Sequence, residues 1–242
     1  MSSPAPADLA AFESARARVL ATIADSCARV GRDPADVTLV AVSKTVHAER
    51  LVAAVAAGLT ILGENRVQEG EAKAALVDGA TWHLVGPLQS NKAKRALATF
   101  AVIESVDSVE LAERLDRLAA DVRPGERVPV LLEVNVDSDA AKAGFDPNVL
   151  ADALPGLAGF QHLELRGLMT VGRLVEQPED ARPTFIALRE LSERLRATSG
   201  SAGSALGRAL SMGMSDDYPI AIEEGATIVR VGRALFGERH QH

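Results

Sequence analysis

The sequence predicts an α/β protein: a single (β/α)₈ barrel of the TIM type with an additional helix at its N-terminus. Three observations favour this fold, namely short apolar runs rich in β-branched residues, amphipathic stretches between them, and a length of 242 residues. Near-continuous apolar strands that alternate with helices indicate a parallel sheet buried on both faces. An open, doubly wound sheet is the alternative, but no G-x-G-x-x-G motif follows the first predicted strand.

The predicted elements alternate in order along the chain, as barrel units require. We expect strands at Val37–Ser43, Thr60–Gly63, Trp82–Gly86, Val102–Val106, Val128–Val136, Leu165–Val171, Ala209–Met214 and Thr227–Val231. We expect helices at His47–Ala57, Arg66–Leu76, Asn91–Ala98, Val109–Ala119, Pro147–Leu154, Pro178–Arg196 and Asp216–Glu224, and the additional helix at Ala7–Val30. One domain is expected over residues 1–242, with the barrel proper at about 37–237.

Local signals mark several boundaries of these elements. Asp107 and Asn65 are each followed three residues later by Glu or Gln, which is the spacing of a helix capping box or its variant. Gly58 stands where the first helix of the barrel should end. The segment Thr198–Gly207 is rich in Ser, Gly and Ala, and it predicts a mobile loop before the seventh strand.

Composition excludes several classes of protein. The formal net charge is -7, and nucleic-acid binding needs a basic surface that neutralises phosphates. No segment has the roughly 18 consecutive apolar residues of a membrane span. Cys27 is the single cysteine, and the first twenty residues lack the basic and apolar regions of a secretory signal, so we expect a cytoplasmic protein. His and Cys are too few and scattered to form a metal site.

A lysine stands at the most informative position of the predicted barrel. Active sites of such barrels form where the carboxyl ends of the strands meet the following loops. Lys44 ends the first strand, VTLVAVSK, and partial burial there would lower the pKa of its amine and make it a nucleophile towards a carbonyl. A lysine whose apolar stem reaches from the strand end into solvent is the structural alternative.

The loops after the last two strands have the composition of a phosphate site. Barrels often bind phosphate with the loops after strands seven and eight and the N-terminus of a short helix. Here these loops read SMGMSDD and VRVGRALFG, in which glycines allow a close approach of backbone N–H groups, and Ser211 offers a hydroxyl. Glycines that only form tight turns would give the same pattern.

Other candidate residues admit two interpretations each. His83 lies within the strand TWHLVG, where it is either an interior histidine with satisfied hydrogen bonds or a contact to a cofactor. Asn65 is either a helix cap or a site residue, and the basic stretch after Asn91 is most simply a solvated helix face. Glu64 and Glu69 are acidic, yet no pattern pairs them as a catalytic acid and base.

Six segments match a known family in chain order: AVSKT, GENRVQEG, WHLVGPLQSNKAK, GLMTVG, LSMGMSDD and VRVGRALFG. They run from residue 41 to residue 237, which covers most of the chain. With these segments the chain resembles the pyridoxal phosphate homeostasis protein family, a group of single-domain proteins similar to the N-terminal barrel of alanine racemase.

The resemblance implies a pyridoxal 5′-phosphate site whose residues are all at strand ends. Lys44 would form the Schiff base, Ser211 and the backbone around Gly232 would hold the phosphate, and Arg230 would face the pyridine nitrogen. The full set of expected cofactor-binding residues is Lys44, Asn65, His83, Met169, Ser211, Arg230, Gly232 and Arg233. Position 233 is often a small hydroxyl residue in this family, so the arginine here leaves the role of that side chain open.

Three functions follow from these residues. The first is a protein that carries or buffers pyridoxal phosphate, takes part in vitamin B6 and amino-acid homeostasis, serves pyridoxal-phosphate-dependent apo-enzymes, and has no strong catalytic activity. Arg230 favours it, because a cation beside the pyridine nitrogen makes the cofactor a poorer electron sink. The alternatives are a racemase-like enzyme that uses pyridoxal phosphate and a cofactor-free aldolase. No catalytic residue is predicted, because racemisation needs a second acid or base that the sequence does not reveal.

Overall fold

In the computed structural model, eight parallel strands form one closed barrel in the order of the chain. The strands are β1 (Thr38–Val42), β2 (Ile61–Glu64), β3 (Thr81–Leu84), β4 (Val102–Val106), β5 (Val128–Glu133), β6 (Leu163–Met169), β7 (Ala209–Ser211) and β8 (Ile228–Val231). The structure describes residues 6–173, 175–198 and 200–237, so both ends of the expected domain lie outside the described residues. The closed barrel confirms the predicted fold class and excludes the open, doubly wound sheet.

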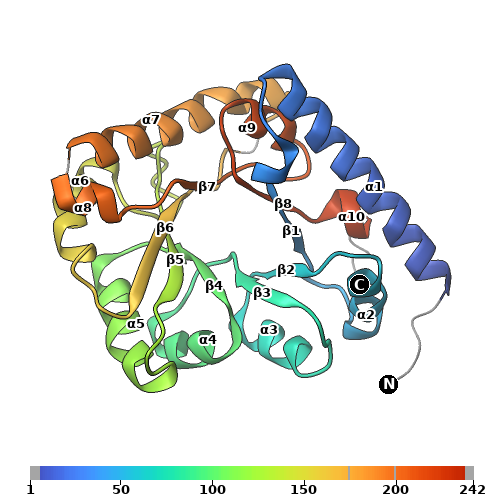
Figure 1. The fold of residues 1–242 in the computed structure, drawn as a ribbon, viewed down its shortest axis with the longest axis horizontal. Coiled ribbons are helices and arrows are strands. Elements are labelled where there is room, and N and C mark those ends of the chain that lie inside the picture. The colour runs from blue at the N-terminus through green and yellow to red at the C-terminus, as the bar shows by residue number, and fades with distance from the viewer. Residues whose placement is uncertain (1–5, 174, 199, 238–242) are drawn as a thin grey trace.

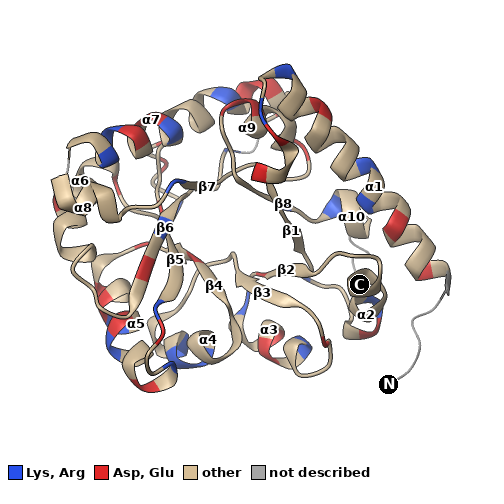
Figure 2. Ribbon diagram, in the orientation of Figure 1, with Lys and Arg blue, Asp and Glu red and all other residues tan. Residues whose placement is uncertain are grey.

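The helices surround the strands (Figure 1). They are α1 (Pro6–Arg29), α2 (Ala48–Ala56), α3 (Val67–Ala74), α4 (Ala93–Thr99), α5 (Val109–Val122), α6 (Pro147–Leu157), α7 (Arg182–Thr198), α8 (Gly200–Ala205), α9 (Tyr218–Glu223) and α10 (Arg233–Phe236). Short 3₁₀ helices lie at Pro34–Asp36, Ser90–Lys92 and Pro178–Ala181. Charged residues of both signs lie along the outer helices (Figure 2), as expected for the solvated faces of amphipathic helices.

Alternation along each strand separates two layers of side chains. One set, including Leu62, Leu84 and Leu132, packs with the helices in the main apolar core. The other set faces the interior of the barrel, where Val40 and Val42 belong to a separate small apolar cluster. The interior also holds polar side chains, which are described below with the candidate site.

Helix α1 covers the place where the first and last strands meet. β1 pairs with β8, and the helix that follows β8 has only four residues. α1 packs against α2, α9 and α10, and it buries Phe12 and Cys27. The ring of Phe12 meets Phe236 of α10 edge to face at 5.6 Å, so α1 supplies the apolar cover that the short α10 does not.

Three local expectations were wrong. Ser108, and not Asp107, caps α5, because its extended backbone lets its Oγ accept a hydrogen bond from Leu111 N. Asn65 is not the cap of α3, since the cap position falls on the next residue and carries no side-chain hydrogen bond.

The predicted loop Thr198–Gly207 contains helix α8, although residue 199 lies outside the described residues. A Cβ on Gly203 would lie 2.7 Å from the carbonyl oxygens of Leu195 and Arg196, so the small residues serve close packing against α7. Gly58, by contrast, has a φ of +86° at the end of α2, as predicted.

Candidate functional site

Lys44 directly follows β1, at the carboxyl end of the barrel where sites of this fold form. The next residue, Thr45, has a φ of +68°, which is a strained conformation for a β-branched residue. Such strain persists only where the surrounding structure holds it, and it is concentrated at functional sites. The backbone of the turn at residues 43–45 is therefore held in one conformation, which fixes the position from which the side chain of Lys44 extends.

A buried polar chain crosses the interior of the barrel from β3 to β8. His83 Nδ1 lies 2.6 Å from Glu104 Oε1, and Ser211 Oγ donates to Glu104 Oε2 at 2.6 Å. Arg230 donates from Nη1 to Ser211 Oγ at 2.6 Å and from Nη2 to the carbonyl oxygen of Thr170 at 2.8 Å. Three of the residues predicted at the site, His83, Ser211 and Arg230, are thus brought together by one residue that was not predicted, Glu104.

The charges in this chain compensate one another. Burial acts to raise the pKa of Glu104, but the hydrogen bond and charge of His83, together with Arg230 and Ser211, lower it below its ordinary value. Burial lowers the pKa of Arg230, and Glu104 is the largest of the opposing influences. The guanidinium nevertheless remains a cation, because the ordinary pKa of arginine lies above about 12. The interior therefore holds two opposite charges, on Glu104 and Arg230, that are bridged by the hydroxyl of Ser211.

The second serine of the SMGMS segment lies at the short helix after β8. Ser215 Oγ accepts hydrogen bonds from Gly232 N at 3.2 Å and from Ala234 N at 3.4 Å. Gly213 allows this turn, because its φ is +89° and a Cβ would lie 2.5 Å from the Cβ of Ala221. Sequence reasoning missed Ser215, although it stands within the predicted phosphate loop.

Gly232 and Arg233 differ in what they offer to the site. A Cβ on Gly232 would lie 3.2 Å from the carbonyl oxygen of Val42, so the last strand end closely approaches the first. The guanidinium of Arg233 instead pairs with Asp216, and both side chains are more than half exposed. The structure therefore directs the Arg233 side chain to the surface and leaves only its backbone beside Gly232.

Asn65 and Met169 lie at the ends of their strands as predicted. Asn65 is half-buried after β2, and a Cβ on Gly86 would lie 2.5 Å from its carbonyl oxygen. Met169 is fully buried and pairs with Ser211 in the neighbouring strand. Both residues are therefore held by close packing within the ring of strand ends.

Glu133 is a further residue of the site that the sequence did not reveal. It ends β5 with 6% of its surface exposed, and its Oε2 is buried without a hydrogen-bond partner among the described residues. Burial and the nearby charge of Asp107 raise the pKa of Glu133 to about 7, while Arg230 acts to lower it. This carboxyl can therefore both hold and release a proton near neutral pH.

Outside the barrel wall, a second buried cluster supports the turn that carries Lys44. Glu64 is fully buried, and its Oε1 accepts hydrogen bonds from Ser43 Oγ at 2.8 Å and from Lys73 Nζ. Lys73 Nζ also donates to the carbonyl oxygen of Ser43 at 2.9 Å. Lys73 of α3 thus ties β2 to the end of β1, one residue before Lys44.

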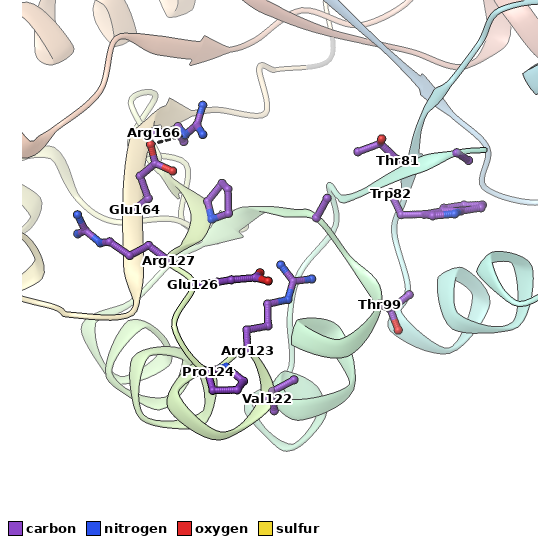
Figure 3. Close-up of a pocket in the computed structure, with 13 residues that line it drawn as sticks. Thr81, Trp82, Thr99, Val122, Arg123, Pro124, Glu126, Arg127, Glu164 and Arg166 are labelled. Atoms are coloured by element: carbon purple, nitrogen blue, oxygen red, sulfur yellow. Dashed lines mark ion pairs between the residues drawn. The ribbon is translucent and has the colours of Figure 1, made fainter. Parts of the chain in front are cut away.

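A surface cavity lies at the opposite end of the barrel, beside the N-terminal ends of β3 to β6 (Figure 3). It measures about 940 Å³ and is lined by Arg123, Arg127 and Arg166, among others. Arg166 pairs with Glu164 at 2.7 Å, and Arg123 donates to a backbone carbonyl at 2.6 Å. Residues at this end of a barrel support its stability, so we place the candidate site at the other end.

Metal-site clusters and membrane-spanning helices are both absent from the described part of the chain. No group of three or more His, Cys, Asp or Glu side chains there has the arrangement of a metal site. None of the helices described there combines the length and the hydropathy that a membrane span requires.

The closed barrel of eight parallel strands belongs to a class of βα-barrel domains, and a family model identifies which one. The model of the alanine racemase N-terminal domain matches residues 19–240, so the chain belongs to that family. An alanine racemase of Clostridium difficile shares the fold at 16% identity, with a TM-score of 0.68 over 92% of this chain and 56% of the racemase.

Within that class the chain belongs to the family of pyridoxal phosphate homeostasis proteins. The protein of this name from Aquifex aeolicus is 41% identical over 92% of this chain and 96% of its own length. The one from Pseudomonas aeruginosa is also 41% identical, over 92% and 94%. PipY of Synechococcus elongatus, solved with pyridoxal phosphate bound, is 42% identical with a TM-score of 0.77, over 89% of this chain and 100% of that one.

Proposed function

We propose that this protein binds pyridoxal 5′-phosphate covalently at Lys44 and carries or buffers it within vitamin B6 and amino-acid homeostasis. The family to which the chain belongs supports the proposal, as does the solved PipY structure with this cofactor. The single observation that carries it is the junction of β1 and β8. There a lysine on a strained turn, a buried arginine and a glycine-lined helix start come together.

The residues present fit the chemical groups of the cofactor. A Cβ on Gly232 would crowd the carbonyl oxygen of Val42, and backbone N–H groups at a helix start suit a phosphate. Two of these groups, Gly232 N and Ala234 N, already converge on the hydroxyl of Ser215. We assign the phosphate to the backbone of Gly232 and Arg233 and to the hydroxyl of Ser215, in place of the predicted Ser211. Ser211 already hydrogen-bonds Glu104 and Arg230 in the barrel interior, and we assign it to positioning Arg230.

The remaining site residues orient the cofactor. Arg230 would face the pyridine nitrogen, while Asn65, His83 and Met169 would lie along the ring. When bound, pyridoxal phosphate supplies a carbonyl for amines and an electron sink. Arg230 weakens the electron sink, because the Glu104–Ser211 chain holds its guanidinium as a cation that disfavours a protonated pyridine nitrogen. We therefore propose a carrier that exchanges its cofactor with amines and turns over amino acids weakly.

We further propose that the protein acts in the cytoplasm and delivers the cofactor to pyridoxal-phosphate-dependent apo-enzymes. The buried, unpaired thiol of Cys27 is consistent with a reducing compartment. A reversible covalent attachment suits such a role, since the aldehyde is protected from other amines while it is held.

Peptide mapping tests the attachment. The protein is incubated with pyridoxal phosphate, reduced with borohydride and digested, and the phosphopyridoxyl mass should be on the peptide that contains Lys44. Lys44→Ala should lose both this mass and the visible absorption band of the Schiff base. Lys94→Ala, on an exposed face of α4, should keep both. A label on Lys92 or Lys142 would refute the assignment to Lys44.

A racemase-like enzyme is the second candidate, and Glu133 is the observation that favours it. A buried carboxyl that titrates near neutral pH could act as an acid or base opposite the lysine. The test is to incubate the loaded protein with L- and D-alanine in deuterated water and follow chirality and α-proton exchange. Turnover at an ordinary enzymatic rate of about 1–10³ s⁻¹ would overturn the carrier function.

A further inference from the structure

Glu133 differs from the other carboxyl group in the barrel interior. Glu104 uses both oxygens, one towards His83 and one towards Ser211. Glu133 has a buried Oε2 with no hydrogen-bond partner among the described residues. A buried carboxyl oxygen without a partner costs free energy unless a ligand supplies a donor. The interior therefore contains an acceptor that the fold itself does not use.

The register of the strands places this acceptor on the floor of the site. Glu133 of β5 pairs with Met169 of β6, and Met169 pairs with Ser211 of β7. Paired residues of adjacent parallel strands point to the same side of the sheet, so these three side chains form one inward row. Because Ser211 contacts Arg230, the row ends at the residue assigned to the pyridine nitrogen.

The surroundings of Glu133 determine what kind of donor would fit. Two charged groups affect the pKa of the Glu133 carboxyl: Asp107, which follows β4, and Arg230 of β8. The guanidinium of Arg230 already donates hydrogen bonds to Ser211 and Thr170. An anionic ligand group would be repelled by the carboxylates of Glu133 and Asp107. A primary ammonium group can donate to the free oxygen and lose a proton to it, which matches the kind of molecule that exchanges with a lysine-bound carbonyl.

We propose that Glu133 is the acid–base residue for cofactor exchange: it takes a proton from an incoming primary ammonium group and passes it to Lys44. This inference rests on the proposed function, because it requires a carbonyl held at Lys44. It assigns to Glu133 a role as a catalytic residue in release and loading, not in the turnover of amino acids.

The exchange balances without any further reactant. The carbon is held at the start by a double bond to Lys44 Nζ, which carries one proton. The incoming ammonium loses one proton to the Glu133 carboxylate and becomes a free amine, whose nitrogen then forms a bond to that carbon. The same nitrogen gives up a second proton as the bond from the carbon to Lys44 Nζ breaks, and Nζ receives both protons, which the Glu133 carboxylate passes on one after the other. Lys44 ends as an ammonium group, the incoming nitrogen keeps one proton and the double bond to the carbon, the carboxylate is restored, and no electrons are transferred to or from any other species.

Release kinetics test the inference. The loaded protein is mixed with L-alanine, as a free amino acid, and with Nα-acetyl-lysine, as a model of a lysine side chain, and release is followed by absorbance between pH 5 and 9. The parent rate should rise through about pH 7, where Glu133 ionises. Glu133→Gln should lose this inflection and slow release about 10²-fold or more, and Glu133→Asp should restore part of both. The arm with the faster release identifies the amine source that the site favours.

Glu164→Gln is the matched control, because Glu164 lies at the opposite end of the barrel (Figure 3), and it should keep the parent rate and profile. A second readout needs no cofactor: carbon-13 NMR of glutamate-labelled protein should show one carboxyl titrating near pH 7 that is absent in Glu133→Gln. If Glu133→Gln loads the cofactor and releases it with the parent profile, the inference is overturned while the proposed function stands. If the parent itself does not load, both are overturned.

Discussion

Replacing Lys73 by Met should strongly destabilise the protein, because it leaves a buried carboxylate without its charge partner. Glu64 is fully buried and Lys73 is 12% exposed, so solvent cannot replace the lost interaction. Removing one partner of a buried pair typically costs about 3–5 kcal/mol. For a chain of this size about 1 kcal/mol corresponds to roughly 2–4 °C, so we expect the melting temperature to fall by about 6–20 °C.

Urea unfolding followed by circular dichroism measures this effect. Arg95→Met is the matched control: its pair with Glu71 is about half exposed on both sides, and such pairs contribute about 0–1 kcal/mol. The double variant Lys73→Met, Glu64→Leu should recover much of the loss, since an apolar pair of similar volume can replace a buried ion pair. A free energy of unfolding for Lys73→Met that matches Arg95→Met would refute the reasoning.

Three further predictions concern the site. The pKa of Glu133 is raised to about 7 in the folded state. Its contribution to the free energy of unfolding is therefore fully present below the ordinary pKa of 4.5 and is lost as pH rises through 7. In urea unfolding at pH 8, Glu133→Gln should therefore be more stable than the parent by about 3 kcal/mol. A difference in the free energy of unfolding that stays constant from pH 4 to pH 8 would contradict this. Ser215→Ala should weaken pyridoxal phosphate binding by about 1.5–3 kcal/mol in a spectroscopic titration. Ser211→Ala should weaken it less, and the reverse order would return the phosphate to Ser211. Gly86→Ala should displace the backbone of Asn65, which lies 2.5 Å from the new Cβ, and lower both stability and cofactor affinity; unchanged thermal melting would refute that close approach.

The barrel and its lysine could be predicted because both depend on local patterns. Near-continuous apolar strands indicate burial on both faces wherever they occur, and Lys44 is recognisable as the residue at which the first strand ends. Arg230 was recognisable as a polar residue at the end of the last strand, and its expected place beside the pyridine nitrogen came from the family resemblance.

The partners of these residues could not be predicted in the same way. Ser211 and Ser215 are four residues apart in one loop, and only the turn at Gly213 decides which hydroxyl reaches the helix start after β8. Glu104 and Glu133 lie in strands whose inward face depends on register across the whole barrel. Pairing between Lys73 and Glu64 joins a helix to the preceding strand through packing that no short spacing encodes.

The position of α1 makes the single thiol of this chain a natural reporter. Cys27 lies on the buried face of α1, and burial raises the pKa of its thiol, so alkylation must wait until the helix detaches. The rate of labelling therefore measures how often the junction between the last and first strands is uncovered. Since Gly232 and Lys44 flank that same junction, a ligand that bridges them should slow the labelling. The labelling rate then reports occupancy of the site without relying on the absorbance of the ligand.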